Sequence, residues 1–261
     1  MHVSNISKGP LAPNFSVPLV FGCSNLQSGR LTSHVSALDG ILGFGKYSTS
    51  LISQLYSQGK APRVFSQCLK GDNSGGGIVI FGEVVEPNMS YTPLIPNQIH
   101  YKINLESISI NEHILNIDPK VFTTSSSNGA IIDSGTTMAY FIEGVYNPIV
   151  EAITHTIPQS IVTTDSDGFH CYLITTSVMD IFPSISLNFA NNASLVLRPQ
   201  DYLILIPALE GEKWCLVIQK TQDITLLGGS LPVNVSTPSS GKERNKKGGT
   251  SPCDKHEKLI M

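Results

Sequence analysis

The 261 residues carry a formal net charge of −3, and only 14% of them are charged, well below the roughly one quarter that is typical of soluble domains. This slight acidic excess provides no basic face, so nucleic acid is not an expected partner. The five cysteines are widely spaced and the seven histidines form no metalloprotease pair, so neither a metal nor a cofactor is expected. The length suits one large domain or two modest lobes.

The first part of the chain consists of short apolar runs separated by turn-forming residues, which is typical of a β-rich fold. Residues 17–24 predict a buried strand, and residues 41–43 predict a tight apolar strand that ends in a glycine. A short capped helix is expected at 50–59. Two further strands are expected at 63–69 and 77–84.

The second part continues the same pattern. Apolar and polar residues alternate over 100–111, which predicts half-buried strands. Residues 143–156 predict a helix in which Pro148 fits only in the first turn. Short apolar or alternating runs predict four more strands, at 169–174, 182–189, 194–204 and 214–219.

The stretch 129–137, Gly-Ala-Ile-Ile-Asp-Ser-Gly-Thr-Thr, is the most informative part of the sequence. Its apolar residues predict a buried strand that ends at Asp133, and Gly135 permits a sharp turn directly afterwards. The hydroxyl groups that follow can donate hydrogen bonds to this carboxylate. An ordinary Asp-Ser-Gly turn is the simplest alternative, because all three residue types favour turns.

A match longer than Asp-Ser-Gly alone favours an active-site motif over an ordinary turn. Residues 130–137 resemble the second active-site motif of pepsin-like aspartic proteases, most closely the plant form. Residues 37–45 and 223–229 are similar to the two apolar-apolar-glycine segments of that family. The resemblance covers about 17–228 and implies an all-β, bilobal, pepsin-like fold. Its N-terminal lobe is incomplete here, because the first aspartate loop and the flap have no counterpart, and the final strand of the family pattern, beyond Gly228, is also missing.

The resemblance divides the chain into four parts. Residues 1–16 remain unassigned, 17–97 form a partial N-terminal lobe, and 98–228 form the C-terminal lobe. Residues 229–261 are rich in Ser, Pro, Gly and Lys, so this atypical tail is expected to be disordered.

The resemblance also implies roles for individual residues. Asp133 would be a catalytic aspartate that activates water to hydrolyse internal peptide bonds of a polypeptide substrate, preferably beside bulky apolar residues. Its loop would be supported by Ser134, Gly135, Thr136 and Thr137. The bracing segments would be formed by Ile41, Leu42, Gly43, Leu226, Leu227 and Gly228. Cys171 and Cys215 would form a disulfide, while Cys23 and Cys68 would find their partners in parts of the family pattern that this chain lacks.

The expected compartment is the secretory pathway or the extracellular space. Five asparagines, each followed two positions later by serine, are candidate glycosylation sites: Asn5, Asn14, Asn88, Asn192 and Asn234. The N-terminal residues contain no apolar core of signal-peptide length, and the motifs favour a start further upstream.

Three functions remain open at this stage. The first is an aspartic endopeptidase, which needs two aspartates that share a proton; only Asp133 is present, so the chain alone is expected to be inactive. The second is a catalytically inactive pepsin-like binding or inhibitor protein. The third is a β-rich fragment without a function of its own. Homodimerisation could restore two aspartates, but the chain already contains pieces of both lobes, so a monomer is expected.

Overall fold

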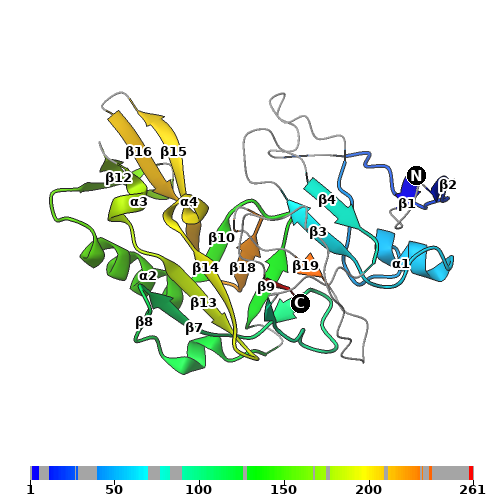
Figure 1. Cartoon of the computed structure of the whole chain (residues 1–261), viewed down its shortest axis with the longest axis horizontal. Coiled ribbons are helices and arrows are strands. Elements are labelled where there is room, and N and C mark those ends of the chain that lie inside the picture. The colour runs from blue at the N-terminus through cyan, green and yellow to red at the C-terminus, as the bar shows by residue number, and fades with distance from the viewer. Residues whose placement is uncertain are drawn as a thin grey trace.

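The computed structural model describes residues 2–5, 12–26, 28, 40–69, 77–82, 90–125, 128–166, 168–174, 177–208, 211–229, 231, 235–236 and 259–260. Most of the regular structure in these residues is β-strand, arranged in several small sheets (Figure 1). The all-β expectation is therefore confirmed.

The part of the chain before residue 98 contains one helix and short strands. Its elements are β1 (His2–Asn5), β2 (Ala12–Ser16), α1 (Leu51–Ser57), β3 (Ser66–Leu69), β4 (Gly77–Ile80) and β5 (Ser90–Tyr91). The predicted helix forms because the Ser50 hydroxyl accepts the N–H of Ser53, and Gly59 ends it with a φ of 64°. Strands β3 and β4 pair antiparallel.

Two strand predictions in this part are wrong. Residues 17–24 form no strand, because the Gln54 side chain of α1 bonds the N–H and the carbonyl of Val20 at 2.8 and 2.9 Å. Residues 41–43 form no strand either, and the side chains of Ile41 and Leu42 are 84% and 61% exposed. Neither apolar run has a strand beside it among the described residues, so nothing supplies ladder hydrogen bonds there.

The rest of the chain is larger and richer in strands. Its elements up to the second long helix are β6 (Lys102–Ile103), β7 (Leu105–Ile110), β8 (His113–Ile114), a 3-10 helix (Pro119–Phe122), β9 (Ala130–Asp133), β10 (Ala139–Ile142) and α2 (Glu143–Thr156). The later elements are β11 (Val162–Ser166), β12 (Phe169–Ile174), α3 (Val178–Ile181), β13 (Ile185–Phe189), β14 (Ala193–Leu197), α4 (Pro199–Tyr202), β15 (Leu203–Ala208), β16 (Gly211–Leu216), β17 (Ile218–Thr221), β18 (Thr225–Gly228), β19 (Val235–Ser236) and β20 (Leu259–Ile260).

Two details differ from the expectations for this part. The single strand expected at 194–204 is divided into β14 and β15 by the short helix α4, because Pro199 starts that helix and Asp201 accepts the N–H of Arg198 at 2.8 Å. Pro148 lies inside α2 rather than in its first turn. Helix α2 itself is confirmed, with Val145, Ile149 and Ile153 buried.

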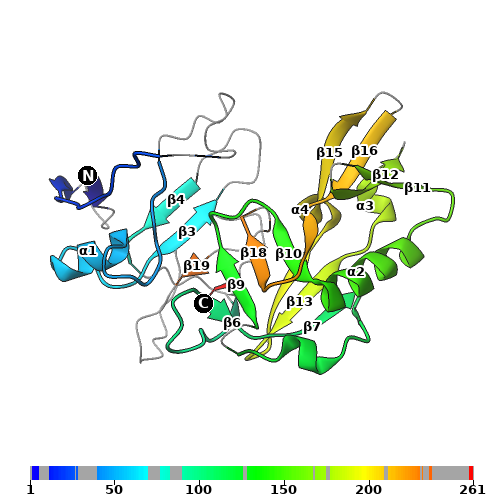
Figure 2. The same cartoon turned by 180° about the vertical axis from the view of Figure 1, so that it is seen from behind.

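Strands β6 to β18 form three sheets. The first has the order β17-β10-β18-β9-β6, the second β11-β12-β16-β15, and the third β14-β13-β7-β8. Figures 1 and 2 show β9, β10 and β18 in the middle of the molecule, between β3 and β4 on one side and α2 to α4 on the other. One hydrophobic cluster joins the two parts, because it includes Ile52 and Phe65 together with residues of all three sheets.

The tail and several glycosylation candidates lie largely outside the described residues. Within 229–261, two short segments form strands: β19 pairs with β3, and β20 pairs with β5. Asn88 and Asn234 are outside the described residues, and the side chains of Asn5 and Asn14 are likewise not described. Asn192 lies exposed in the turn between β13 and β14, with a φ of 56°.

Candidate active site around Asp133

Asp133 is the last residue of β9, and its carboxylate is exposed. Its Oδ1 accepts the N–H of Gly135 at 3.0 Å, and its Oδ2 accepts the hydroxyl of Thr136 at 2.6 Å. The N–H of Thr136 also donates to the backbone carbonyl of Asp133 at 3.1 Å, which closes the turn. Two donors on two different oxygens fix the orientation of the carboxylate while leaving it open to solvent.

The strand β18 holds this turn from the side. It runs parallel to β9, with Leu226 beside Ile131, Leu227 beside Ile132 and Gly228 beside Asp133. A Cβ on Gly228 would stand only 2.0 Å from the carbonyl oxygen of Met138. Glycine at 228 therefore lets the backbone after Asp133 cross directly over β18.

The next residue, Gly229, completes this contact. Its N–H donates to the carbonyl of Thr136 at 2.7 Å. A Cβ at this position would stand 3.1 Å from the carbonyl oxygen of Ser134. The segment 226–229 thus contacts both ends of the Asp133 turn.

The corresponding segment 41–43 has a different environment. Gly43 has open space around the position of a Cβ, and its carbonyl accepts the N–H of Leu51 at the start of α1. Ile41, Leu42 and Gly43 do not enter the sheet that contains Asp133. The bracing role of this segment stays a prediction.

The other expected loop residues point in different directions. The Ser134 hydroxyl lies 3.5 Å from Oε1 of Gln67, a buried residue of β3, whereas Thr137 is exposed. In the described part of the chain, the partners of the Asp133 carboxylate are a backbone N–H and a hydroxyl, and no second carboxylate is among them.

Two residues near the site were missed by the sequence analysis. Gln67 reaches Ser134 from β3, and Tyr101 accepts the N–H of Ile132 on its carbonyl oxygen at 3.0 Å. The alternation over 100–111 indicates a strand at Tyr101 but not its neighbour in space. For Gln67, which follows an unremarkable apolar run, the sequence contains no comparable signal.

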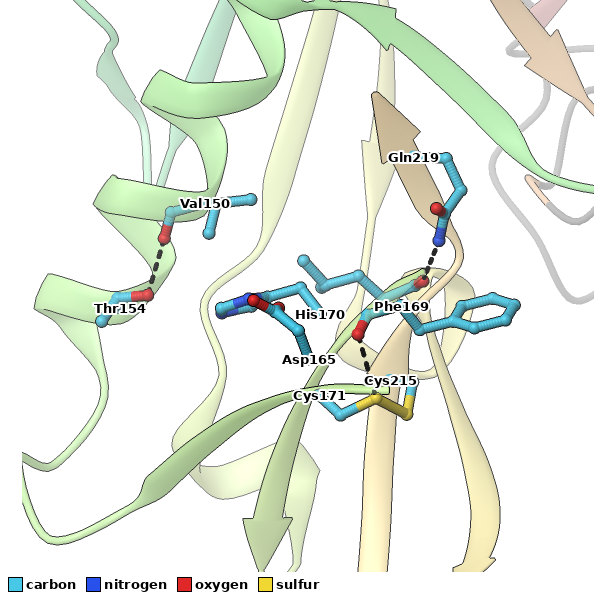
Figure 3. A network of polar contacts seen from close by, with 9 residues as sticks. Val150, Thr154, Asp165, Phe169, His170, Cys171, Cys215 and Gln219 are labelled. Carbon is cyan, nitrogen blue, oxygen red and sulfur yellow. Dashed lines mark hydrogen bonds and ion pairs between the residues drawn. A yellow bond between two sulfur atoms is a disulfide. The ribbon is translucent and has the colours of Figure 1, made fainter. Parts of the chain in front are cut away.

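A disulfide stabilises the sheet farther from Asp133. Cys171 of β12 and Cys215 of β16 lie opposite each other and form the bond that the resemblance implied. Beside it, Nδ1 of His170 lies 2.8 Å from the Asp165 carboxylate, next to α2 (Figure 3). The disulfide joins β12 to β16, and the His170–Asp165 pair joins β12 to β11.

The other described cysteines behave differently from each other. Cys23 is free, as the resemblance implied, but it is exposed and not part of the buried strand that was predicted for 17–24. Cys68 is disulfide-bonded, so the expectation that it lacks a partner in this chain is wrong. Its partner lies outside the described residues.

Neither a metal centre nor a membrane helix is found in the described ranges. They contain no group of three or more His, Cys, Asp or Glu side chains that could hold a metal ion. No helix among them is both long and apolar enough to cross a bilayer.

Comparison with known proteins places this site in a family. The family model described as "Xylanase inhibitor N-terminal" matches residues 3–83, and "Xylanase inhibitor C-terminal" matches 100–233, more than half of the chain. Aspartic proteinase 36 and Aspartic proteinase 39 of Arabidopsis thaliana are 37% and 36% identical over 86% of this chain. The chain belongs to the pepsin-like aspartic protease family of plants.

The matches cover most of this chain but a smaller share of each relative. This pepsin-like chain spans only 46% of the length of the two Arabidopsis proteins. A solved structure titled "Crystal structure of edgp" has a TM-score of 0.70 and 20% identity, and the match covers 84% of this chain and 61% of that one. This likeness confirms the bilobal pepsin-like fold.

Proposed function

We propose that this chain is the Asp133-bearing part of an aspartic endopeptidase that hydrolyses internal peptide bonds in polypeptides. The observation that carries the proposal is the Asp133 carboxylate, which is exposed to solvent and oriented by the Gly135 N–H and the Thr136 hydroxyl. A carboxylate in this state can accept a proton from water while the water attacks a carbonyl carbon. The relatives named aspartic proteinases support this assignment.

The proposed reaction needs a second carboxyl group. One carboxylate takes the proton of the water, while a protonated partner polarises the scissile carbonyl and the pair shares a proton. The sequence contains a single Asp-Ser-Gly-Thr-Thr stretch. Catalysis therefore requires a partner aspartate from a longer form of the polypeptide, and the 261 residues alone are inactive.

Two experiments test this proposal together. Capturing the native protein from tissue through a peptide around Asp133 and measuring its intact mass shows whether it exceeds the 28.1 kDa of these residues. A larger native form should hydrolyse a denatured polypeptide in acid and lose this activity when Asp133 is changed to Asn. The exposed Asp223, changed to Asn in the same form, is the charge-matched control and should keep the activity.

The outcomes separate the possibilities. Acid proteolysis by the 261 residues alone, abolished by Asp133→Asn, would contradict the need for a second aspartate. A larger native form that shows no Asp133-dependent hydrolysis would overturn the protease assignment itself.

A catalytically inactive binding or inhibitor protein is the second candidate. It is supported by the single catalytic-type aspartate and by the family description, which names xylanase inhibitors. A native mass equal to that of these residues, together with tight binding of a partner protein that survives Asp133→Asn, would favour this function.

We further propose that the protein is a monomeric glycoprotein of the secretory pathway or extracellular space. Asn192 is the candidate site whose exposed side chain is described, and its sequon residue Ser194 donates to Asn188 at 3.0 Å. Treatment with an N-glycosidase should lower the mass of the native protein. A native protein whose mass is unaffected by the glycosidase would contradict glycosylation.

A further inference from the structure

Tyr101 is bonded to both parts of the molecule. Its hydroxyl donates to the carbonyl of Phe44 at 2.7 Å, and its ring packs edge-on against Phe65 with a centroid distance of 5.7 Å. Its own carbonyl accepts the N–H of Ile132, the residue before Asp133, at 3.0 Å. A single residue thus joins a loop of the N-terminal part to the strand that presents the carboxylate.

The far end of this connection is well anchored. The carbonyl of Lys46 accepts a guanidinium N–H of Arg63 at 3.2 Å. The ring of Phe44 packs against Phe65 and Phe81, with centroid distances of 5.1 and 6.3 Å. Because its neighbours are held in this way, the Phe44 carbonyl is a fixed acceptor for the Tyr101 hydroxyl.

The connection from Tyr101 to the strand that carries Asp133 is direct. Residues 102 and 103 continue as β6, which pairs with β9 through Lys102 opposite Ile131 and Ile103 opposite Ala130. A movement of Tyr101 along the line to Phe44 therefore acts on β9 directly before Asp133. The ammonium of Lys46 lies 5.3 Å from the centre of the Tyr101 ring, which adds a favourable cation–π contact.

We propose that Tyr101 is a positioning residue that couples the loop at Phe44 to the orientation of the Asp133 carboxylate. The proposal rests on the functional role assigned to Asp133. Burial raises the pKa of Tyr101 to about 12, so its hydroxyl remains a donor from acid to moderately alkaline pH. If a polypeptide moves the N-terminal part as it binds, Tyr101 would transmit this movement to the orientation of the Asp133 carboxylate.

Replacement of Tyr101 by Phe removes only the hydroxyl, and the Gly135 amide reports the consequence. Because this N–H donates to Asp133 Oδ1, its resonance in a 15N-labelled protein follows the position and charge of the carboxylate. We expect Tyr101→Phe to shift the Gly135 resonance and to change its response to pH, together with a shift at Ile132.

Tyr202 provides a matched control in the same protein. Its buried hydroxyl donates to the carbonyl of Pro183 at 2.6 Å, so Tyr202→Phe removes the same kind of bond from another place. It should lower the melting temperature and leave Gly135 unchanged. If Tyr101 had only a structural role, the Gly135 resonance would respond in the same way to both substitutions.

The proposal is overturned if the Gly135 response is unchanged in Tyr101→Phe, or if Tyr202→Phe changes it equally. If Tyr101→Phe does not fold, Arg63→Met is measured in its place, with the same expected change at Gly135. This substitution removes the hydrogen bond from Arg63 to the Lys46 carbonyl, which anchors the Phe44 loop, and keeps the Tyr101 hydroxyl. These readouts need no proteolysis. A failure to find Asp133-dependent activity would therefore contradict the proposed function and leave the coupling measurable.

Discussion

Gly228 lies directly beside Asp133 on the parallel strands β18 and β9, and the space above Gly228 is filled by the backbone that follows Asp133. The carbonyl oxygens of Met138 and Thr136 would stand 2.0 and 2.6 Å from a Cβ at this position. These are main-chain atoms that cannot rotate away as a flexible side chain could. The Asp133 turn and this glycine therefore require each other.

Gly228→Ala should accordingly be strongly destabilising. We expect a loss of more than about 3 kcal/mol in the free energy of unfolding, the upper end of ordinary overpacking, measured by urea denaturation. Gly43→Ala is the matched control from the other apolar-apolar-glycine segment, where a Cβ meets open space; it should change stability by about 0.5 kcal/mol or less. Equal effects of the two substitutions would contradict the difference between the two segments.

Thr136→Val should impair any activity that depends on Asp133. The substitution removes the hydroxyl that donates to Oδ2 at 2.6 Å, so the carboxylate loses one of its two fixed donors. In an active form of the protein we expect kcat to fall by about tenfold or more, which corresponds to about 1.4 kcal/mol. Thr136→Ser keeps the hydroxyl and should retain most of the activity. Wild-type kcat in Thr136→Val would show that the hydroxyl is dispensable.

Loss of the Cys171–Cys215 disulfide should lower stability without affecting the Asp133 turn. The two cysteines are 44 residues apart, and a loop of this size gives about 4 kcal/mol in the chain-entropy treatment. The double variant with alanine at both positions should therefore melt well below the wild type. Cys23→Ser, which replaces a free and exposed thiol, should have the same melting temperature as the wild type. A double variant as stable as the wild type would contradict this estimate.

Stability should decrease in alkaline solution because of buried tyrosines. Burial raises the pKa of Tyr101 and of Tyr172 to about 12, above the value of about 10 expected in the unfolded chain. Between these values the folded state holds more protons, so the contribution is complete below about pH 10 and is lost as the pH rises toward 12. Tyr172→Phe should flatten this dependence in unfolding measurements at different pH. An unfolding free energy that stays constant over this range would contradict the assignment.

The sequence indicates local features of the site well. A strand that ends in Asp133 and the turn at Gly135 both follow from residue types next to one another, whereas a bracing segment that ends at Gly228 was implied only by the family resemblance. Helix α2 was also predictable from its periodicity, because Val145, Ile149 and Ile153 occupy one face.

Features that depend on distant neighbours were not predictable. Ile41 and Leu42 look like a buried strand, but a strand needs a partner, and the described structure places none beside them. Gln67 contacts Ser134 in the turn and Tyr101 contacts Ile132 in β9, across long sequence separations that a single sequence does not reveal. The helix α4 is different, because Pro199 followed by Asp201 is a local start signal that the alternation of apolar residues concealed.

The parallel pairing of β9 with β18 also determines when the site can form during synthesis. Residue 133 leaves the ribosome long before residue 228, which must lie beside it, and the intervening hairpins can fold first. Such a distant pairing is slow, because the chain between the strands must be closed before the contacts stabilise it. The nascent polypeptide therefore lacks the strand beside the Asp133 turn until the β18 segment has emerged, which makes the completion of the site a late step of folding.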